Sequence, residues 1–208
     1  MSQKIFFLST RQRCYLPLKR FFDLFFSLIS ILFLSFFMLI ISFFVLVDTG
    51  SFPIFRQKRV GKNNKEFLIL KFRSMKKGTP DNVPSHLLEN SNQYISKFGR
   101  FLRRFSIDEI PQLFNIFIGQ MSFIGPRPAL WNQFDLIELR EKNKSCYIKP
   151  GLSGLAQCNG RDLLSVEEKA TLDGIYFNNF SFCLDTKLFF KTIINVFSKK
   201  DVIEGKQS

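Results

Sequence analysis

The chain has 208 residues, and 30 Lys and Arg outnumber 17 Asp and Glu, which gives a formal charge of +13. Apolar residues make up 46% of the sequence, enough for a packed core, so the composition excludes disordered, collagen-like and disulfide-scaffold classes. His86 is the only histidine, which excludes a His-rich zinc site, and the widely spaced Cys14, Cys146, Cys158 and Cys183 predict free thiols in a reducing, cytoplasmic compartment.

The first element is an uncharged apolar run of 24 residues, 24–47. As a helix it would span about 36 Å, longer than the hydrocarbon core of a bilayer at ~30 Å. Five Lys or Arg precede this run and five follow it as far as Phe67, so the flanking charges give no preferred direction of insertion. A simple span and a re-entrant hairpin both stay open on these residues. The hairpin would keep both basic clusters at the anionic cytoplasmic leaflet.

A hairpin needs a break within the membrane, where unsatisfied backbone groups are costly. Neither Pro nor Gly occurs between Asp23 and Val47, so the sequence does not mark such a break plainly. The hydroxyls of Ser30, Ser35 and Ser42 are the groups that could bond freed carbonyls there.

The composition from Ser51 onward is that of a water-facing domain. Short strand-like runs at 53–57 and 67–72, around a turn at 61–64, predict a β-hairpin. The polar stretch 76–92 predicts a loop. Residues 96–104 predict a basic amphipathic helix, which lies either in the lipid interface or against a core.

The remaining elements are predicted mainly as helices. One helix is expected at 106–120, closed by a Gly-Pro-Arg-Pro turn, and another at about 129–144. The Gly-rich segment 149–161 predicts a loop. The segment 166–198 predicts two helices with a break near Asn178 and Asn179.

The segment 103–111 holds the residues that are the best candidates for catalysis. Ser106 and Glu109 have the spacing of a capping box, which would make this the start of a helix and nothing more. Alternatively, a helix N-terminus would keep Asp108 ionised as a nucleophile or a Mg²⁺ ligand. Arg103 and Arg127 would then hold a diphosphate, which points to phosphoryl transfer at a lipid surface.

Several motifs together resemble those of the bacterial sugar transferases, the monotopic phosphoglycosyl transferases. The resemblance runs from about residue 19 to 187. In length, the chain resembles the small members of the family, including those that begin bacillosamine-containing glycans. It rests on KRFFD at 19–23, PxFxQxRxG at 53–61, KFRSM at 71–75, DEIPQLFN at 108–115, MSFIGPRP at 121–128, KPGLSG at 149–154 and LAQxNGR at 155–161.

The resemblance implies a mostly helical α+β fold with a re-entrant membrane helix, a small β-hairpin and amphipathic interfacial helices. Residues 1–50 would be embedded in the bacterial inner membrane, and 51–208 would form a catalytic domain on its cytoplasmic face. The family's helix usually breaks at a Ser-Pro pair, whereas Ser35 is followed here by Phe36.

The implied activity transfers a sugar 1-phosphate, expected to carry an N-acetylated amino sugar, from a UDP-sugar to undecaprenyl phosphate with release of UMP. The product would begin assembly of an O-antigen, capsule, exopolysaccharide or glycoprotein glycan. Anionic lipid and downstream glycosyltransferases are the further partners expected. By resemblance, Asp108 is the nucleophile that forms a phosphosugar intermediate and a ligand of Mg²⁺, Glu109 is its partner, Lys71, Arg103 and Arg127 bind phosphate, and Arg161 contributes to the nucleotide or sugar pocket.

Three other functions compete with this one. A hexose 1-phosphate transferase of the same family differs only in the donor. A non-catalytic, membrane-bound interaction protein would keep the fold without using Asp108. Binding of nucleic acid is not expected, because the basic residues are spread along the chain without a recognition motif.

Overall fold

The computed structural model describes residues 8–79, 94–160 and 163–198. The fold is α+β and mostly helical, as expected. Its helices are α1 (Thr10–Thr49), α3 (Lys97–Arg104), α4 (Gln112–Phe117), α5 (Phe134–Lys142), α6 (Leu155–Cys158), α7 (Val166–Asn179) and α8 (Phe182–Ser198), with 3-10 turns η2 (Lys62–Asn64), η4 (Ile107–Glu109) and η5 (Ser145–Tyr147). The strands are β1 (Ile54–Val60), β2 (Glu66–Phe72), β3 (Ser122–Ile124), β4 (Ala129–Leu130) and β5 (Gly151–Ser153).

Helix α1 contains the apolar run and extends it at both ends. A capping box between Ser9 and Gln12 starts it, and Gly50, with φ 60°, ends it in the left-handed conformation that glycine adopts without strain. It is the one helix in the described part of the chain that is long and apolar enough to cross a membrane. Phe33 and Phe36, on its outer face, are 85% and 72% exposed.

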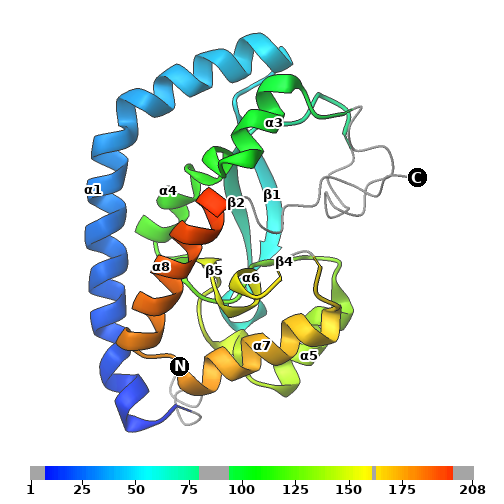
Figure 1. Cartoon of the computed structure of the whole chain (residues 1–208). Helices are drawn as coiled ribbons and strands as arrows, with labels where there is room; N and C mark the ends of the chain where they lie inside the picture. The colour runs from blue at the N-terminus through cyan, green and yellow to red at the C-terminus, as the bar shows by residue number, and fades with distance from the viewer. Residues whose placement is uncertain (1–7, 80–93, 161–162, 199–208) are drawn as a thin grey trace.

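The inner face of α1 packs on the rest of the chain along its whole length. Near its start, Gln12 Nε2 donates to the Phe177 carbonyl at 2.8 Å. Near its end, Ile41 and Val45 are buried in a cluster with Phe72 of β2. Figure 1 shows α1 running along one side of the molecule and then bending over the top of the remaining elements. Both ends of α1 therefore contact the same domain.

Serine hydroxyls in the apolar part of α1 bond carbonyls of the preceding turn. Ser35 Oγ donates to the Leu32 carbonyl at 2.8 Å, and Ser42 Oγ donates to the Met38 carbonyl at 2.7 Å. Ser35 and Ser42 are two of the three serines that could bond freed carbonyls at a break, but α1 is continuous from Thr10 to Thr49. Bonds of this kind are often found where helices bend. The only Pro of α1 is Pro17, near its start, so the bend over the top of the molecule in Figure 1 is made without a Pro.

The predicted β-hairpin is confirmed. Strands β1 and β2 are antiparallel and joined through η2, with Phe55 opposite Lys71 and Arg59 opposite Phe67. The prediction of a helix over 129–144 is wrong at its start. Ala129 pairs with Val60 as part of β4, which adds a third strand to the hairpin, and α5 begins only at Phe134.

Much of the segment 149–161, predicted as a loop, forms regular structure between residues 151 and 158. Strand β5 pairs in parallel with β3, and α6 follows at once. The pairing brings Gly125 and Gly151 so close that a Cβ on Gly151 would lie 2.1 Å from the Gly125 nitrogen. The glycines that suggested a loop are therefore required by the close approach of two backbones.

Helix α3, the predicted amphipathic segment, packs one part of its apolar surface on the core and leaves another part exposed. Leu102 is fully buried and Phe98 packs on the core, whereas Phe101 is 49% exposed. Helices α7 and α8 confirm the predicted pair, with the break at Phe180 and Ser181. The four cysteines are free, as expected.

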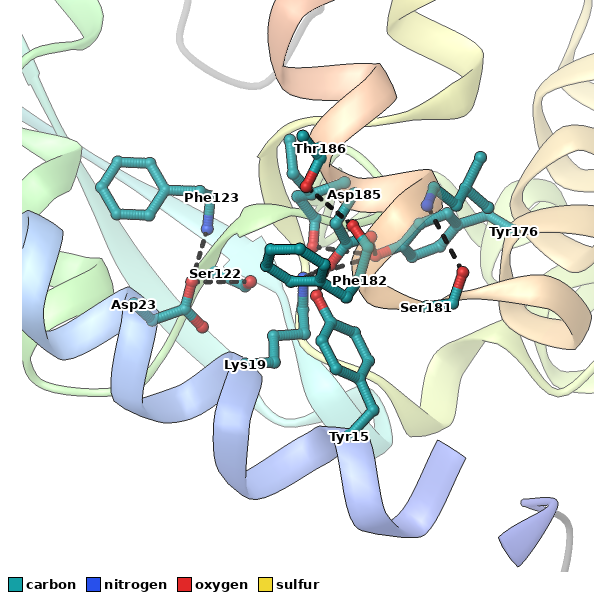
Figure 2. Close-up of polar contacts among 12 residues, drawn as sticks. Tyr15, Lys19, Asp23, Ser122, Phe123, Tyr176, Ser181, Phe182, Asp185 and Thr186 are labelled. Atoms are coloured by element: carbon teal, nitrogen blue, oxygen red, sulfur yellow. Dashed lines mark hydrogen bonds and ion pairs between the residues drawn. The ribbon is translucent and has the colours of Figure 1, made fainter. Parts of the chain in front are cut away.

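A cluster of polar side chains, here the Asp185 cluster, fixes the first turns of α1 to α7 and α8. Tyr15 donates to Asp185 Oδ2 at 2.8 Å, Tyr176 donates to Asp185 Oδ1 at 2.7 Å, and Lys19 forms an ion pair with the same carboxylate. Figure 2 shows Tyr15 and Lys19 projecting from α1 toward Asp185 and Tyr176. One turn further along α1, Asp23 accepts bonds from the Ser122 hydroxyl and the Phe123 amide, at 3.0 and 3.1 Å.

Candidate active site

Asp108 and Glu109 lie side by side in the short 3-10 turn η4 and are only 8% and 7% exposed. The predicted capping box is wrong, because Ser106 has φ 54° and its side chain caps no amide. Pro111 separates η4 from α4, so the single helix predicted over 106–120 is two short pieces. The two carboxylates are thus placed by a strained turn, and no long helix dipole acts on them.

Glu109 is the centre of a group of ionic side chains, here the Glu109 cluster. Lys71, near the end of β2, donates to Glu109 Oε1 at 2.8 Å, and Arg127, from the turn after β3, approaches the same oxygen at 3.3 Å. The side chains of Lys71 and Glu109 are 16% and 9% exposed. The fold therefore brings together four of the predicted site residues: Asp108, Glu109, Lys71 and Arg127.

Arg59 is a further member of this cluster, and it was not among the site residues predicted from the sequence. Its guanidinium donates to Gln57 Oε1, at 2.6 and 3.0 Å, and to the Pro128 carbonyl at 3.1 Å. Burial and the charge of Arg127 lower the pKa of Arg59 to about 9, and Glu109 opposes this shift. The alternation of Phe55, Gln57 and Arg59 on one face of β1 was the signal available in the sequence.

The cluster carries an excess of positive charge. Burial lowers the pKa of Lys71, Glu109 and Asp108 raise it, and Arg127 and Arg59 lower it again. Three basic groups therefore act on one another around two carboxylates in a poorly hydrated place. A dianionic or trianionic ligand would relieve their repulsion, and a diphosphate has that charge and suits guanidinium groups.

Arg103 is not part of this group, and Arg161 cannot be compared with it. Arg103 is half-buried in the last turn of α3, and no side-chain hydrogen bond or ion pair is seen for it among the described residues. Its neighbour Arg104 lines the cavity described next. Arg161 lies outside the described residues, so its role stays a prediction.

A cavity of about 240 Å³ opens beside Glu109 and Arg127. Its opposite wall is formed by β5, α6 and α8, which are far from η4 in the sequence. The residues that line it are Arg104, Ser106, Glu109, Ile110, Leu113, Arg127, Leu152, Ser153, Gln157, Cys158, Thr192, Asn195 and Val196. The site thus joins a charged end to a largely apolar pocket, an arrangement typical of sites for small organic ligands.

The donor groups suit magnesium better than a transition metal. In residues 8–79, 94–160 and 163–198, no group of three or more His, Cys, Asp or Glu is arranged to hold a metal ion. Mg²⁺ commonly binds through one or two carboxylates together with substrate phosphates and water. Asp108 and Glu109 are carboxylates of the kind that such an ion binds, and Lys71 and Arg127 bind one oxygen of Glu109.

The sequence also matches a family of known proteins. The model of the family described as bacterial sugar transferase covers residues 14–199. The chain belongs to the bacterial sugar transferase family. This family assignment covers α1 from Cys14 onward together with the Glu109 cluster and the cavity.

The chain is also similar to individual sugar transferases and related proteins. The uncharacterized sugar transferase EpsL of Bacillus subtilis (strain 168) is 37% identical over 179 residues, which are 86% of this chain and 87% of that protein. The exopolysaccharide production protein PSS of Rhizobium leguminosarum bv. phaseoli is 33% identical over 194 residues, 86% of this chain and 95% of that protein.

A third relative is longer. The UDP-glucose:undecaprenyl-phosphate glucose-1-phosphate transferase of Klebsiella pneumoniae is 35% identical over 194 residues, which are 88% of this chain and 40% of that protein. The chain thus spans about two fifths of that relative, and the shared part includes most of this bacterial sugar transferase.

Proposed function

We propose that this bacterial sugar transferase moves a sugar 1-phosphate from a UDP-sugar to undecaprenyl phosphate and releases UMP. The observation that carries the proposal is the Glu109 cluster, in which two buried carboxylates meet three basic side chains beside a cavity. The relative from Klebsiella pneumoniae, whose name states such a transfer of glucose 1-phosphate, supports it.

In the first step, an oxygen of the Asp108 carboxylate attacks the phosphorus that carries the sugar. A bond forms between this oxygen and the phosphorus, and the bond from phosphorus to the bridging oxygen of the diphosphate breaks. UMP leaves with the electron pair of that bond, and the phosphosugar stays on Asp108 as a mixed anhydride.

In the second step, a phosphate oxygen of undecaprenyl phosphate attacks the same phosphorus. The bond between phosphorus and Asp108 breaks, which restores the carboxylate and yields the lipid diphosphate sugar. The water-soluble and the lipid substrate then need not occupy the site together, since the phosphosugar waits on the protein.

The basic residues of the cluster act on the charge that develops in both steps. Arg127 is the most exposed of those in ion pairs, with 34% of its side chain accessible, so it can reach the diphosphate directly. Lys71 and Arg59 are held by Glu109 and Gln57, which fixes their positions before the substrate arrives. A Mg²⁺ ion bound at Asp108 would further neutralise the diphosphate.

The proposal includes a re-entrant arrangement of α1 in the membrane, with the catalytic domain on the cytoplasmic face, where the UDP-sugar is made. Three observations support it: the contacts of Gln12 and Val45 with the same domain, the bend of α1, and the exposed phenylalanines on its outer face. A straight span would place the two ends of α1 on opposite faces of the membrane and separate one of them from its partners.

Two classes of donor sugar remain candidates. The small size of the chain, through its resemblance to the small members of the family, favours an N-acetylated amino sugar. The names of relatives favour a hexose instead, since they state glucose for the Klebsiella pneumoniae protein and galactose for one from Erwinia amylovora.

The decisive experiment measures UMP release from a panel of UDP-sugars by the full chain in lipid nanodiscs, with undecaprenyl phosphate and Mg²⁺. We expect release with one class of sugar, and none above background for Asp108→Ala. Asp135→Ala removes an exposed carboxylate on α5 and should leave the rate unchanged. Equal rates for wild type and Asp108→Ala would contradict the proposed chemistry.

The membrane arrangement has its own test. In a background without the exposed thiols of Cys14 and Cys183, single cysteines replace Thr10, the first residue of α1, and Phe52, which follows its end. Both positions should react with an impermeant maleimide only after the inner membrane is opened. Labelling of one position in intact spheroplasts would show that α1 spans the membrane.

A further inference from the structure

Gln157, on α6, stands out in the wall of the cavity. It faces the same cavity as Glu109 and Arg127. Both polar atoms of its side chain, Oε1 and Nε2, are buried and have no hydrogen-bond partner. A buried amide without partners is unfavourable, so its presence next to the charged cluster calls for a ligand that supplies the missing bonds.

The other polar groups on this side of the cavity are already engaged. Thr192 Oγ1 donates to the Leu188 carbonyl at 2.7 Å and also contacts the Ser153 hydroxyl. Asn195 Nδ2 points to the Cys158 carbonyl at 3.5 Å. The rest of this part of the lining is mostly apolar, from Ile110, Leu113, Leu152 and Val196. The amide of Gln157 is therefore an unsatisfied polar group buried in the wall of a largely apolar pocket.

Such a pocket suits a flat ring with a donor and an acceptor on one edge. Uracil has that edge, because its N3–H lies between two carbonyls and can pair with both atoms of a primary amide. The N-acetyl group of a sugar does not, because the N–H and C=O of its trans amide point in opposite directions. A sugar ring would also need several polar partners for its hydroxyls.

We propose that this cavity binds the uracil ring of the UDP-sugar and that Gln157 selects it. Oε1 of Gln157 accepts the N3–H of uracil, and Nε2 donates to a neighbouring carbonyl of the ring. The inference rests on the proposed function, which supplies the UDP-sugar. The charged end of the cavity, at Glu109 and Arg127, would then face the diphosphate.

The side chain of Gln157 must turn to make these bonds, since its polar atoms are closed off from solvent. The turn breaks no hydrogen bond, because the amide makes none where it lies. The backbone of α6 is anchored independently, through the bond from the Cys158 amide to the Gly154 carbonyl at 3.0 Å. Gln157 is thus a specificity residue that contacts the leaving nucleotide away from the reacting phosphorus.

The test compares the binding of UMP and of N3-methyl-UMP to the full chain in nanodiscs by calorimetry. The methyl group removes the N3 donor and blocks the paired edge. Wild type should bind the methylated nucleotide about 10- to 100-fold more weakly than UMP. Gln157→Leu should bind UMP more weakly and lose most of this discrimination. Asn195→Leu, which alters another amide of the same cavity, should keep it.

Each outcome decides the inference. Equal affinity of wild type for the two nucleotides would overturn it, and this measurement does not depend on any variant folding. Unchanged discrimination in Gln157→Leu would also overturn it and would leave the side chain a packing role. If wild type turns over a UDP-sugar but binds UMP and N3-methyl-UMP equally well, the uracil pocket is rejected and the proposed function stands. Wild type that neither turns over UDP-sugars nor binds UMP would reject both.

Discussion

Two buried carboxylates in this chain, Asp185 and Glu109, each bind a lysine, yet their surroundings differ. Asp185 accepts bonds from Tyr15, Tyr176 and Lys19, so that one negative charge meets one positive charge and two neutral hydroxyls. Burial and Asp185 raise the pKa of Tyr176 well above its ordinary value, which keeps that hydroxyl a donor. The Asp185 cluster is therefore balanced in charge.

The Glu109 cluster is not balanced in the same way. Lys71, Arg127 and Arg59 surround Glu109 and Asp108. Burial, and after it repulsion between the basic groups, lowers the pKa of Lys71 and of Arg59, while Glu109 opposes both shifts. This cluster also borders a cavity. Burial of charge alone therefore does not mark a site. Excess charge of one sign beside a cavity does, because only a ligand completes it.

The strongest test of this contrast is Asp108→Asn, which keeps the shape of the side chain and removes the nucleophile. With a UDP-sugar but no lipid acceptor, wild type should release close to one UMP per protein in a rapid first turnover. The variant should release UMP at least about 10³-fold more slowly. Rapid quench and chromatography measure this burst. A full burst from the variant would exclude Asp108 as the nucleophile.

Asp185→Asn should affect stability and spare the reaction. It removes the ion pair of Lys19, whose side chain is 14% exposed, which costs about 3 kcal/mol of the free energy of unfolding. Chemical denaturation in detergent measures this loss. The kcat/KM of the folded fraction should stay near that of wild type. A large fall in kcat/KM at full folding would place the Asp185 cluster in the reaction.

Glu109→Gln should lower the reaction rate, by less than Asp108→Asn does. Glutamine can still accept one hydrogen bond from Lys71, but the negative charge that holds Lys71 and Arg127 is lost. We expect the rate to fall about 10- to 100-fold, because the phosphate-binding groups are no longer fixed. The measurement is kcat/KM with the preferred donor, and an unchanged value would reduce Glu109 to a structural ion pair.

The sequence predicted the elements with strong local patterns. The apolar helix, the hairpin and the pair α7 and α8 were all visible as runs, turns and periodicity. The segments 106–120, 129–144 and 149–161 were predicted less well. There the backbone is governed by partners distant in the sequence, such as β1 for β4 and β3 for β5, and local propensity does not report such pairing.

The site shows the same division. Asp108, Glu109, Lys71 and Arg127 could be named because they lie in long recognisable motifs. The roles of Arg59 and Gln157 could not be assigned. In the sequence, Arg59 is one of several charges on a predicted strand. Only the structure shows that it lies near Arg127 and Glu109. Gln157 becomes conspicuous only when the structure shows that its amide is buried without a partner.

The smallest expected effect concerns Lys149, outside the Glu109 cluster. It tests whether crowded positive charge lowers the stability of the fold there as well. Lys149 lies near Arg20, Lys62, Lys19 and Asp23. Burial first, and then the neighbouring cations, lower its pKa to about 8, while Asp23 raises it. Because the group is only half-buried, solvent screening limits the effect on stability to about 1 kcal/mol or less.

The direction follows from proton linkage. Below pH 8, Lys149 is charged in both the folded and the unfolded chain, so the cost of burying the charge is fully present. Between pH 8 and the ordinary lysine pKa, the folded chain has lost this proton and the unfolded chain keeps it, so folding becomes more favourable as the pH rises. Lys149→Met lacks this contribution. The unfolding temperature of wild type, measured relative to Lys149→Met, should therefore increase from pH 7.5 to pH 9.5, and a decrease would show that Lys149 gains more from Asp23 than it loses by burial.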